Sequence, residues 1–184
     1  MDSGIYIIFG KSGCGKSFIT RNAVQKSNNL VYVPSHTTRK MRPGEDIRSD
    51  YKFVTNEEFK ENIDDCIEYS LVYDNYYGLM KNDLFSKLRE NTNVIIIMDQ
   101  NGVKSMKKLF GSHVRSIFID SDDDRISKQL NNRPGNDQDH KRISNDLGYT
   151  VTCEVDHTVF NDGTMLPVDE VVKICSERFS CREW

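Results

Sequence analysis

Residues 10–17 combine three glycines with a lysine and a serine in the spacing Gly-x-x-x-x-Gly-Lys-Ser. The apolar run 5–9 before them predicts a buried strand, and the pattern of 18–25 after them predicts a helix. Glycines let the backbone N–H groups converge on an anion, and the positive end of the helix dipole strengthens that attraction. The sequence therefore predicts a phosphate-binding loop rather than an accidental glycine-rich turn. In this loop Lys16 reaches the β- and γ-phosphates of a nucleotide and the Ser17 hydroxyl ligates Mg²⁺.

A second group of potential anion-binding side chains lies between residues 35 and 51. Arg39 and Arg42 are three residues apart in a polar segment, and Tyr51 follows nine residues after Arg42. An arginine fork matches phosphate oxygens bidentately, and a tyrosine hydroxyl adds a neutral donor. A solvated basic loop would have the same composition. The residues by themselves leave both interpretations open.

The elements that position these groups alternate along the chain. Such alternation is typical of a parallel sheet flanked by helices. Ligands bind beyond the carboxyl ends of the strands in such a sheet, where the glycine-rich loop lies. The predicted strands are 5–9, 30–33, 94–98, 114–119 and 157–160, and the predicted helices are 18–25, 103–110, 122–130, 141–150 and 168–179.

Two segments interrupt this alternation. Residues 35 to about 90 are rich in Arg and Tyr and contain β-like runs around 51–54 and 67–73, with Thr55 and Glu58 placed to cap a short helix. The polar run 131–140 lies between two predicted helices and suits a mobile flap. We expect both segments to flank the bound nucleotide.

The length, composition and amino terminus of the chain bear on its domain number, its relation to membranes and its location. At 184 residues the chain is most simply a single domain, and 37% hydrophobic with 29% charged residues is ordinary for a soluble globular protein. The longest apolar run, 94–98, is too short to cross a membrane. The amino terminus has neither the basic region nor the apolar stretch of an export signal, so we expect a cytoplasmic location.

The cysteines and histidines argue against a zinc site, and the net charge argues against nucleic-acid binding. Five cysteines and four histidines are dispersed without the spacing of a zinc site, so no metal site made of protein side chains alone is predicted. Reduced thiols are expected. A formal net charge of −3 argues against a nucleic-acid partner.

Four ordered motifs, together with the stretches that follow them, resemble those of guanylate kinases. This resemblance implies a P-loop nucleoside monophosphate kinase fold: a three-layer α/β core with a parallel sheet (1–34, 91–130 and 141–184), a GMP-binding insertion (35–90) and a short lid (131–140). It implies ATP-dependent phosphoryl transfer to GMP, and to dGMP, giving a nucleoside diphosphate and ADP. The motifs are the phosphate loop, Ser35-His-Thr-Thr-Arg39-Lys-Met-Arg42-Pro-Gly-Glu45, Asp50-Tyr51-x-Phe53-Val and Asn75-Tyr-Tyr77-Gly78, and the similarity continues through Asp99-Gln-Asn-Gly-Val-Lys104 to Val159-Phe-Asn161-Asp162.

The resemblance also implies roles for individual residues. Arg133 and Arg142 would clamp the ATP phosphates, Asn161 would lie near the ATP base, and Glu45 would support the arginines of the GMP site. The implied ATP-binding residues are Gly10, Ser12, Gly13, Cys14, Gly15, Lys16, Ser17 and Asn161; Arg39, Arg42, Tyr51 and Tyr77 would hold the GMP phosphate; Ser35, Glu68 and Asp99 would read the guanine; and the catalytic cations would be Lys16, Arg39, Arg133 and Arg142.

The chemistry of guanine agrees with these implied readers. An ionised carboxylate accepts from N1–H and the N2 amine together, and a hydroxyl donates to O6. Adenine presents the opposite pattern and would leave a buried carboxylate unpaired. Two assignments have plain alternatives, because Glu45 could be an ordinary surface carboxylate and Asn161 a turn residue before Asp162 and Gly163.

Three positions depart from the family pattern. Ile97 replaces an aspartate that could support the Mg²⁺ shell, Leu79 replaces a small hydroxyl residue near the guanine, and Gln129 stands where the lid helix often supplies an arginine. Together these substitutions predict a slower or looser enzyme rather than an inactive one.

Other functions are compatible with parts of the sequence. A non-catalytic guanylate-kinase-like binding module would not need Lys16 and Ser17 together with the arginine pair. A GTPase would match Asp99-x-x-Gly102, but no Asn-Lys-x-Asp sequence follows it. A kinase for a different nucleoside monophosphate stays open. The expected partners are ATP and GMP with Mg²⁺ as cofactor, without nucleic acid or membrane, in a monomer or homodimer.

Overall fold

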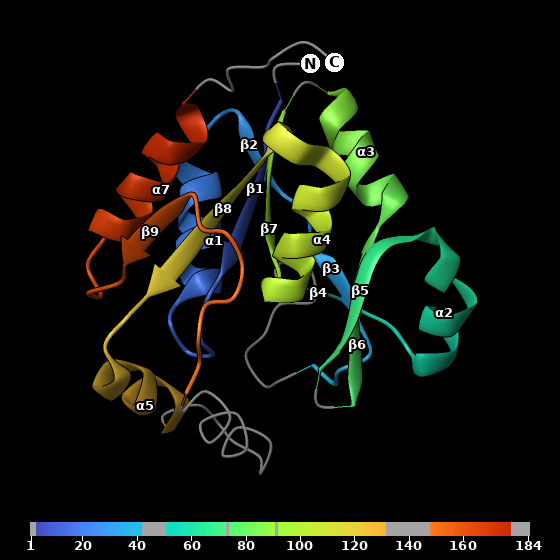
Figure 1. Cartoon of the computed structure of the whole chain (residues 1–184), viewed down its shortest axis with the longest axis horizontal. Helices are drawn as coiled ribbons and strands as arrows, with labels where there is room; N and C mark the ends of the chain where they lie inside the picture. Colours follow the sequence, from blue (N-terminus) through green and yellow to red (C-terminus); the bar gives the residue numbers. More distant parts are fainter. Residues whose placement is uncertain (1–2, 42–50, 73, 91, 132–147, 178–184) are drawn as a thin grey trace.

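The computed structural model of the chain describes residues 3–41, 51–72, 74–90, 92–131 and 148–177. A five-stranded sheet lies at its centre, with the order β2-β7-β1-β8-β9 and every neighbouring pair parallel (Figure 1). Each of its strands coincides with a predicted strand, and the ends differ by at most one residue. The strands are β1 (Ile5–Phe9), β2 (Leu30–Tyr32), β7 (Asn93–Ile97), β8 (Val114–Asp120) and β9 (His157–Phe160).

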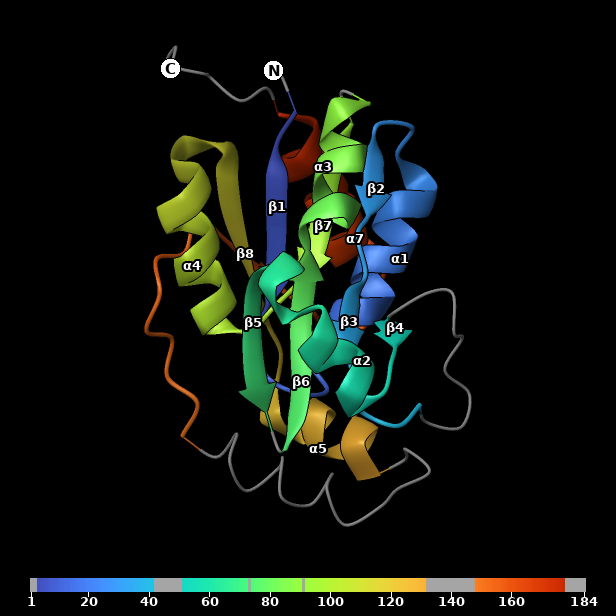
Figure 2. The ribbon, with the colours of Figure 1, turned by 90° about the vertical axis from the view of Figure 1, so that its right-hand side faces the viewer.

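Helices cover both faces of this sheet, as Figures 1 and 2 show. The helices α1 (Lys16–Lys26) and α7 (Leu166–Ser176) pack on one face, and α3 (Lys81–Arg89) and α4 (Gln100–Phe110) pack on the other. Burial on both faces explains why β1 and residues 94–97 of β7 are unbroken apolar runs in the sequence. The predicted α/β fold with a parallel sheet is therefore confirmed. Alternate strand residues line the two faces: Tyr6, Ile8, Ile95 and Ile97 toward α1 and α7, and Ile5, Ile7, Val94 and Ile96 toward α3 and α4.

A second sheet is formed within the segment that interrupts the alternation. Its order is β4-β3-β6-β5; β3 and β4 are parallel and the other pairs are antiparallel. The sequence predicted β4, β5 and the short helix α2, but not β3, β6 or α3. The bounds are β3 (Ser35–Thr37), β4 (Tyr51–Phe53), α2 (Asn56–Glu61), β5 (Cys66–Val72) and β6 (Asn75–Met80), and single 3-10 turns span Ile63–Asp65 and Gly111–His113.

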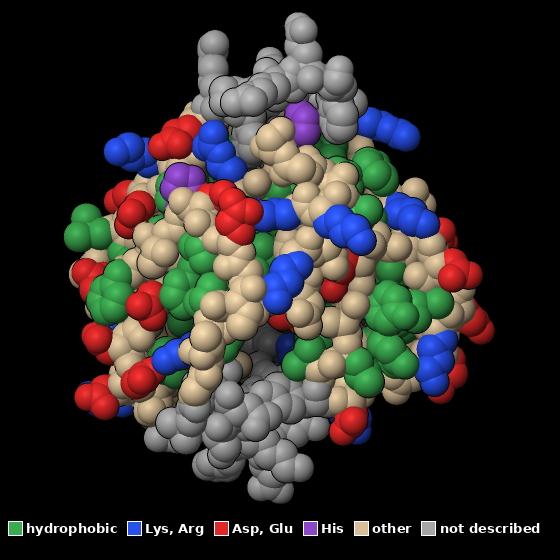
Figure 3. Space-filling model, in the orientation of Figure 1, with side chains coloured by type: hydrophobic (Ala, Val, Ile, Leu, Met, Phe, Trp, Pro, Cys, Tyr) green, Lys and Arg blue, Asp and Glu red, His purple; other side chains and the backbone are tan. Residues whose placement is uncertain are grey.

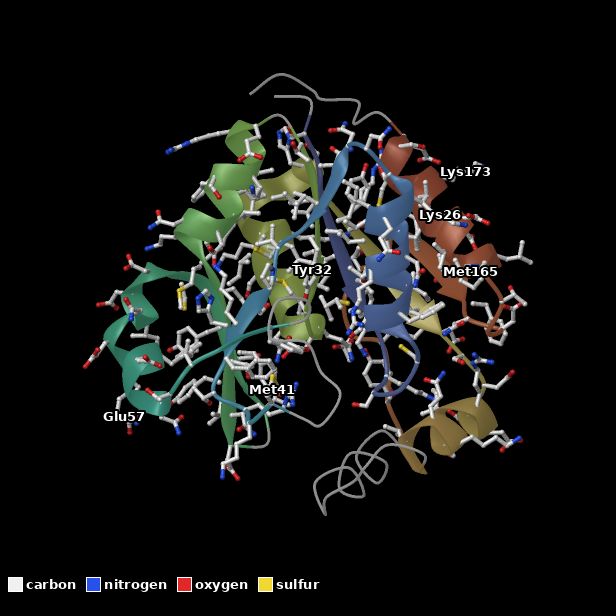
Figure 4. The ribbon with its side chains drawn as sticks, turned by 180° about the vertical axis from the view of Figure 1, so that it is seen from behind. Lys26, Tyr32, Met41, Glu57, Met165 and Lys173 are labelled. Atoms are coloured by element: carbon white, nitrogen blue, oxygen red, sulfur yellow. The ribbon has the colours of Figure 1, made fainter. Side chains whose placement is uncertain are left out.

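Side-chain hydrogen bonds mark the starts of α2 and α7. Thr55 and Glu58 form the expected capping box at the start of α2, with each side chain accepting the backbone N–H of the other residue. Helix α7 begins two residues earlier than predicted, where the Thr164 hydroxyl accepts the Leu166 N–H. Seen from behind, α1 and α7 lie side by side, and the Lys26 ammonium lies 2.5 Å from the Asp169 carboxylate (Figure 4).

The remaining predicted elements lie around the segment between α5 (Asp123–Asn131) and β9. Residues 132–140 of the expected lid and 141–147 of the expected helix lie outside the described residues. Residues 148–150, the end of that expected helix, are not helical. In the described part of the chain, no helix combines the length and apolar character needed to cross a bilayer.

Candidate functional site

The glycine-rich loop joins the end of β1 to the start of α1. Gly10, Gly13 and Gly15 have φ angles of 148°, 80° and 95°, the region that favours glycine. A Cβ on Gly10 would overlap the Ile119 carbonyl oxygen, and a Cβ on Gly15 would overlap the Asn161 side-chain nitrogen. The backbone thus turns tightly before α1, and the helix points its first N–H groups toward the loop.

The positive charge of the loop comes from Lys16 in the first turn of α1. Its ammonium donates to the carbonyl oxygens of Gly10 at 2.8 Å and Lys11 at 2.7 Å, and therefore lies over the loop. Ser17 follows on α1 and is partly exposed. Converging amides, a lysine and a neighbouring hydroxyl form a site suited to a phosphate with a bound cation.

Helix α5 packs directly against this loop. A Cβ on Gly13 would lie 3.0 Å from Leu130 and 3.4 Å from Ile126, two buried residues of α5. At the start of α5, Asp123 accepts a 2.6 Å hydrogen bond from Lys11. The loop therefore lies between the central sheet and α5, which ends at Asn131.

Asn161, at the end of β9, lies beneath the same loop and is 3% exposed. Its side-chain nitrogen donates to the Cys14 carbonyl at 2.8 Å, and its side-chain oxygen accepts the Gly163 N–H at 3.1 Å. Its own carbonyl accepts the Ser121 hydroxyl at 3.0 Å. Ser121, just before α5, thus connects the end of β8 to Asn161. Both polar atoms of the Asn161 side chain are engaged within the protein.

The second sheet brings together three of the predicted anion-binding residues. Arg39 is 6% exposed, and its guanidinium carbon lies 5.4 Å from the ring centres of both Tyr51 and Phe53. The rings of Tyr51 and Tyr77 meet edge to face at 5.7 Å. Ser35, on the buried side of β3, is paired in register with Tyr51. Cation–π contact holds the guanidinium over the Tyr51 and Phe53 rings, and the Tyr77 ring packs against Tyr51.

Phe53 was not predicted as part of this cluster. The period-two spacing of Tyr51 and Phe53 places both on one face of β4, and that spacing was the available signal. Arg42, Glu45, Arg133 and Arg142 lie outside the described residues.

The two predicted guanine-reading carboxylates come from different sheets and meet at the start of α4. Asp99 is the N-cap of α4 and accepts the Gly102 N–H at 2.8 Å. One Glu68 carboxylate oxygen lies 3.2 Å from the place that a Cβ on Gly102 would take. Burial, together with the negative charge of Asp99, raises the pKa of Glu68 to about 7.

Two of the three departures from the family pattern are part of the core. Ile97 is 8% exposed on the face of the sheet toward α1 and α7, and Leu79 is fully buried on the opposite face. Neither side chain offers a polar contact. Gln129 lies half-buried on α5. Among the described residues, no three His, Cys, Asp or Glu side chains are grouped so that they could hold a metal ion.

The phosphate loop and the second sheet lie in different halves of the molecule. The space-filling view shows a hollow near the centre of one face, between these halves and next to residues drawn in grey (Figure 3). An anion-binding loop in one half and an arginine with two tyrosines in the other are each suited to a phosphorylated ligand.

Comparison with known proteins identifies what the chain resembles. The family model described as guanylate kinase matches residues 3–170. The guanylate kinase of Wolbachia sp. subsp. Brugia malayi is 30% identical over 176 residues, which are 92% of this chain and 90% of that protein. The guanylate kinase of Pseudoalteromonas translucida is 36% identical over 138 residues, or 73% of this chain and 66% of that protein.

A solved structure supports the same fold. The crystal structure of guanylate kinase from Anaplasma phagocytophilum superposes with a TM-score of 0.72 and 23% sequence identity. The match covers 95% of this chain and 85% of that chain. At this identity the likeness shows the fold.

Proposed function

The chain belongs to the guanylate kinase family, enzymes that phosphorylate GMP with ATP, and we propose that its two anion-binding clusters hold the two substrates. The phosphate loop holds ATP, and the cluster of Arg39, Tyr51 and Tyr77 holds the GMP phosphate. The observation that carries this proposal is the buried Arg39, which lies over the Tyr51 ring at the second sheet, whereas the phosphate loop follows a strand of the central sheet. A binding module would need no such second phosphate site.

On the ATP side, the backbone of Gly10, Ser12, Gly13, Cys14 and Gly15 surrounds the phosphates, and Lys16 neutralises them. Ser17 would hold Mg²⁺ through its hydroxyl, because Mg²⁺ prefers oxygen ligands. Few protein ligands are needed when phosphate oxygens and water complete the coordination shell of the ion. The bound ion would supply neutralisation of the phosphate oxygens. Because Ile97 is apolar and buried, the side chains here offer less support to that ion than an aspartate would.

On the GMP side, Glu68 and Asp99 read the guanine N1–H and N2 amine, and Ser35 reads O6. Glu68 must be ionised to accept these bonds, and its position beside Asp99 works against ionisation. Arg42 joins Arg39 at the GMP phosphate, and Glu45 supports the pair. No residue of this set is assigned to the sugar, so we include dGMP as a substrate.

Transfer needs no side-chain nucleophile because the acceptor is already an anionic phosphate oxygen. Lys16 and Arg39 hold the donor and acceptor in line, and Arg133 and Arg142, from the expected lid and the segment after it, neutralise the charge of the moving phosphoryl group. Asn161 belongs to the ATP side, beneath the loop. We also retain the predictions of a cytoplasmic location, of a monomer or homodimer, and of no nucleic-acid partner, the last of which rests on the net charge of −3.

The test is a panel of nucleoside monophosphates mixed with Mg-ATP, with ADP release as the readout. We expect release with GMP and dGMP and little with AMP, CMP or UMP. Arg39→Ala should abolish most GMP-dependent release while leaving Mg-ATP affinity within about twofold, since its contacts are in the other cluster. Release that is independent of the acceptor, or equal for all acceptors, would contradict the proposal.

A further inference from the structure

The hydrogen bonds of Asn161 point to a role other than contact with the adenine ring. Asn161 is 3% exposed, and its side-chain nitrogen and oxygen are bonded to Cys14 and Gly163. Because the residue is buried and both polar atoms of its side chain are bonded inside the protein, the side chain is directed at the protein rather than at a ligand. Its bonds instead join the phosphate loop to the turn that follows β9.

The bond to Cys14 controls the direction of a phosphate-binding amide. In a planar trans peptide, the carbonyl of one residue and the N–H of the next point in opposite directions. Because Asn161 holds the Cys14 carbonyl on the inner side of the loop, the Gly15 N–H points outward to the mouth of the loop. Gly15 must also lack a side chain here, since its Cβ would overlap the Asn161 nitrogen. The orientation of the Cys14–Gly15 peptide is thus determined from outside the loop.

Asn161 is itself anchored on both sides. Its backbone N–H donates to Asp120 at 2.8 Å, and its carbonyl accepts the buried Ser121 hydroxyl at 3.0 Å. On the following turn, the Asp162 carbonyl accepts a 3.0 Å bond from Arg125 of α5. The amide therefore projects from a rigid support made by β8, β9 and α5, and it can transmit that rigidity to the loop.

We infer that Asn161 is a positioning residue of the ATP site, whose side-chain amide holds the Cys14–Gly15 peptide so that the Gly15 N–H faces the bound phosphates. This inference rests on the proposed ATP site at the phosphate loop. It predicts that loss of the Asn161 side-chain amide weakens phosphate binding whether or not a base is attached to the phosphates.

Asn161→Asp is the sharpest variant. The carboxylate has the volume of the amide and still accepts the Gly163 N–H, but it sets an oxygen against the Cys14 carbonyl. Affinities are measured for a non-hydrolysable Mg-ATP analogue, for Mg-tripolyphosphate and for GMP. We expect the first two to weaken by the same factor, about ten- to hundredfold as for a small misplacement of a binding group, and GMP to stay within about twofold.

Two further variants complete the experiment. Asn22→Ala is the matched control, because Asn22 is a partly exposed asparagine of α1 whose side-chain nitrogen donates to the Phe18 carbonyl of the same helix. It should leave all three affinities unchanged. Ser121→Ala removes one support of Asn161 and should weaken ATP analogue and tripolyphosphate equally, by about two- to fivefold. If Asn161→Asp does not fold, the affinities of Ser121→Ala test the inference in its place.

Loss of affinity for the ATP analogue with tripolyphosphate unaffected would show that Asn161 contacts the base, and would overturn the inference. Unchanged affinity for both ligands would overturn it as well. Failure of the proposed kinase reaction would give a different result. The unaltered enzyme would bind tripolyphosphate but would release no ADP in response to GMP.

Discussion

At the scale of single residues, the proposed acceptor site contains two carboxylates that lie close together and are partly buried. Asp99 has one oxygen committed to the Gly102 N–H as the N-cap of α4, and Glu68 reaches the same helix start from β5. Their mutual repulsion is relieved when donors are placed between them, and guanine carries two donors on one edge. We therefore expect the proposed site to select guanine through these two charges, whose repulsion is unfavourable while the site is empty.

Asp99→Asn tests the reading of guanine without removing the helix cap, because asparagine caps helices as well as aspartate does. Loss of a charged acceptor should lower kcat/KM for GMP by about ten- to hundredfold, which corresponds to ~1.5–3 kcal/mol. The KM for Mg-ATP should change little. Steady-state kinetics with each substrate varied in turn measures both, and the assignment is wrong if Mg-ATP binding is lost while GMP binding persists.

The raised pKa of Glu68 predicts a pH dependence of GMP binding. Burial and Asp99 raise this pKa to about 7, so in the free enzyme Glu68 is protonated below pH 7 and ionised above it. Guanine requires the ionised form, so GMP affinity should rise with pH through 7 and then level off, and it should fall by up to about tenfold per pH unit below 7.

The GMP phosphate also titrates near pH 6, so the control is Glu68→Gln, which shares that titration but lacks the carboxyl. Calorimetric titrations from pH 5.5 to 8.5 compare the two proteins. The ratio of their GMP affinities should increase up to about pH 7 and stay constant above it. A ratio independent of pH would exclude Glu68 as the titrating guanine reader.

At the scale of elements, an extended segment of residues 148–156 is bound along one side of α4 and leads to β9. The Gln100 side chain bonds to the backbone of Thr150 and Thr152, and Lys107 lies 2.7 Å from Asp156. Helical spacing places Gln100 and Lys107 on the same face of α4, two turns apart. Helix α4, which begins beside Glu68 and Asp99, thus also holds the segment that returns the chain to the central sheet.

Asp156→Asn tests how firmly this segment is held. Burial works against the Asp156 charge, but hydrogen bonds from Lys107 and Ser116 outweigh it and keep the pKa of Asp156 below its usual value. Because the folded pKa is depressed, the stabilisation is present at neutral pH and is lost as pH falls through the ordinary carboxyl range and below. We expect a loss of about 1–3 kcal/mol at pH 7 in urea unfolding.

The destabilisation should shrink as the pH is lowered below about 4, where aspartate becomes protonated in the unfolded chain. Glu154→Gln is the matched control, since Glu154 also faces Lys107 but is 76% exposed, and it should cost less than about 1 kcal/mol. Equal losses for the two variants would show that the charge of Asp156 has no special role.

At the scale of the whole molecule, the proposed reaction requires that ATP at the phosphate loop and GMP at the second sheet meet for transfer. The predicted motifs for both are present, yet the apolar Ile97 and Leu79 leave the site with fewer polar groups than the family pattern provides. Turnover should therefore depend on free Mg²⁺ more strongly than in relatives that have an aspartate at the position of Ile97.

This prediction is tested by measuring kcat with GMP over a range of free Mg²⁺ concentrations. We expect half-maximal activity at a several-fold higher Mg²⁺ concentration than for a relative with the aspartate, and a lower kcat at saturation. Gln129→Arg should raise the affinity for ATP by about two- to fivefold if a missing charge also limits clamping. Ordinary turnover at low Mg²⁺ would remove the hypothesis that the substitutions slow the enzyme.

The sequence by itself determined the features that contiguous residues encode. The phosphate loop follows from glycines and Lys16 within eight positions, and the central strands follow from apolar runs that are buried on both faces. Local patterns also determined the capping box of α2. Short elements with weaker patterns, such as β3 and β6, form because they pair with each other in a second sheet, so their own residues did not reveal them.

Only the tertiary structure decided which distant side chains meet. It placed Glu68 beside Asp99, Phe53 under Arg39 and the Asn161 amide on the Cys14 carbonyl. From the sequence, Asn161 fitted a turn residue and a base contact equally well, because turn propensity is a local property whereas the partner of a side chain is 147 positions away. The packing of β9 against β8 and of α5 against the loop brings that partner within reach, and no local pattern records it.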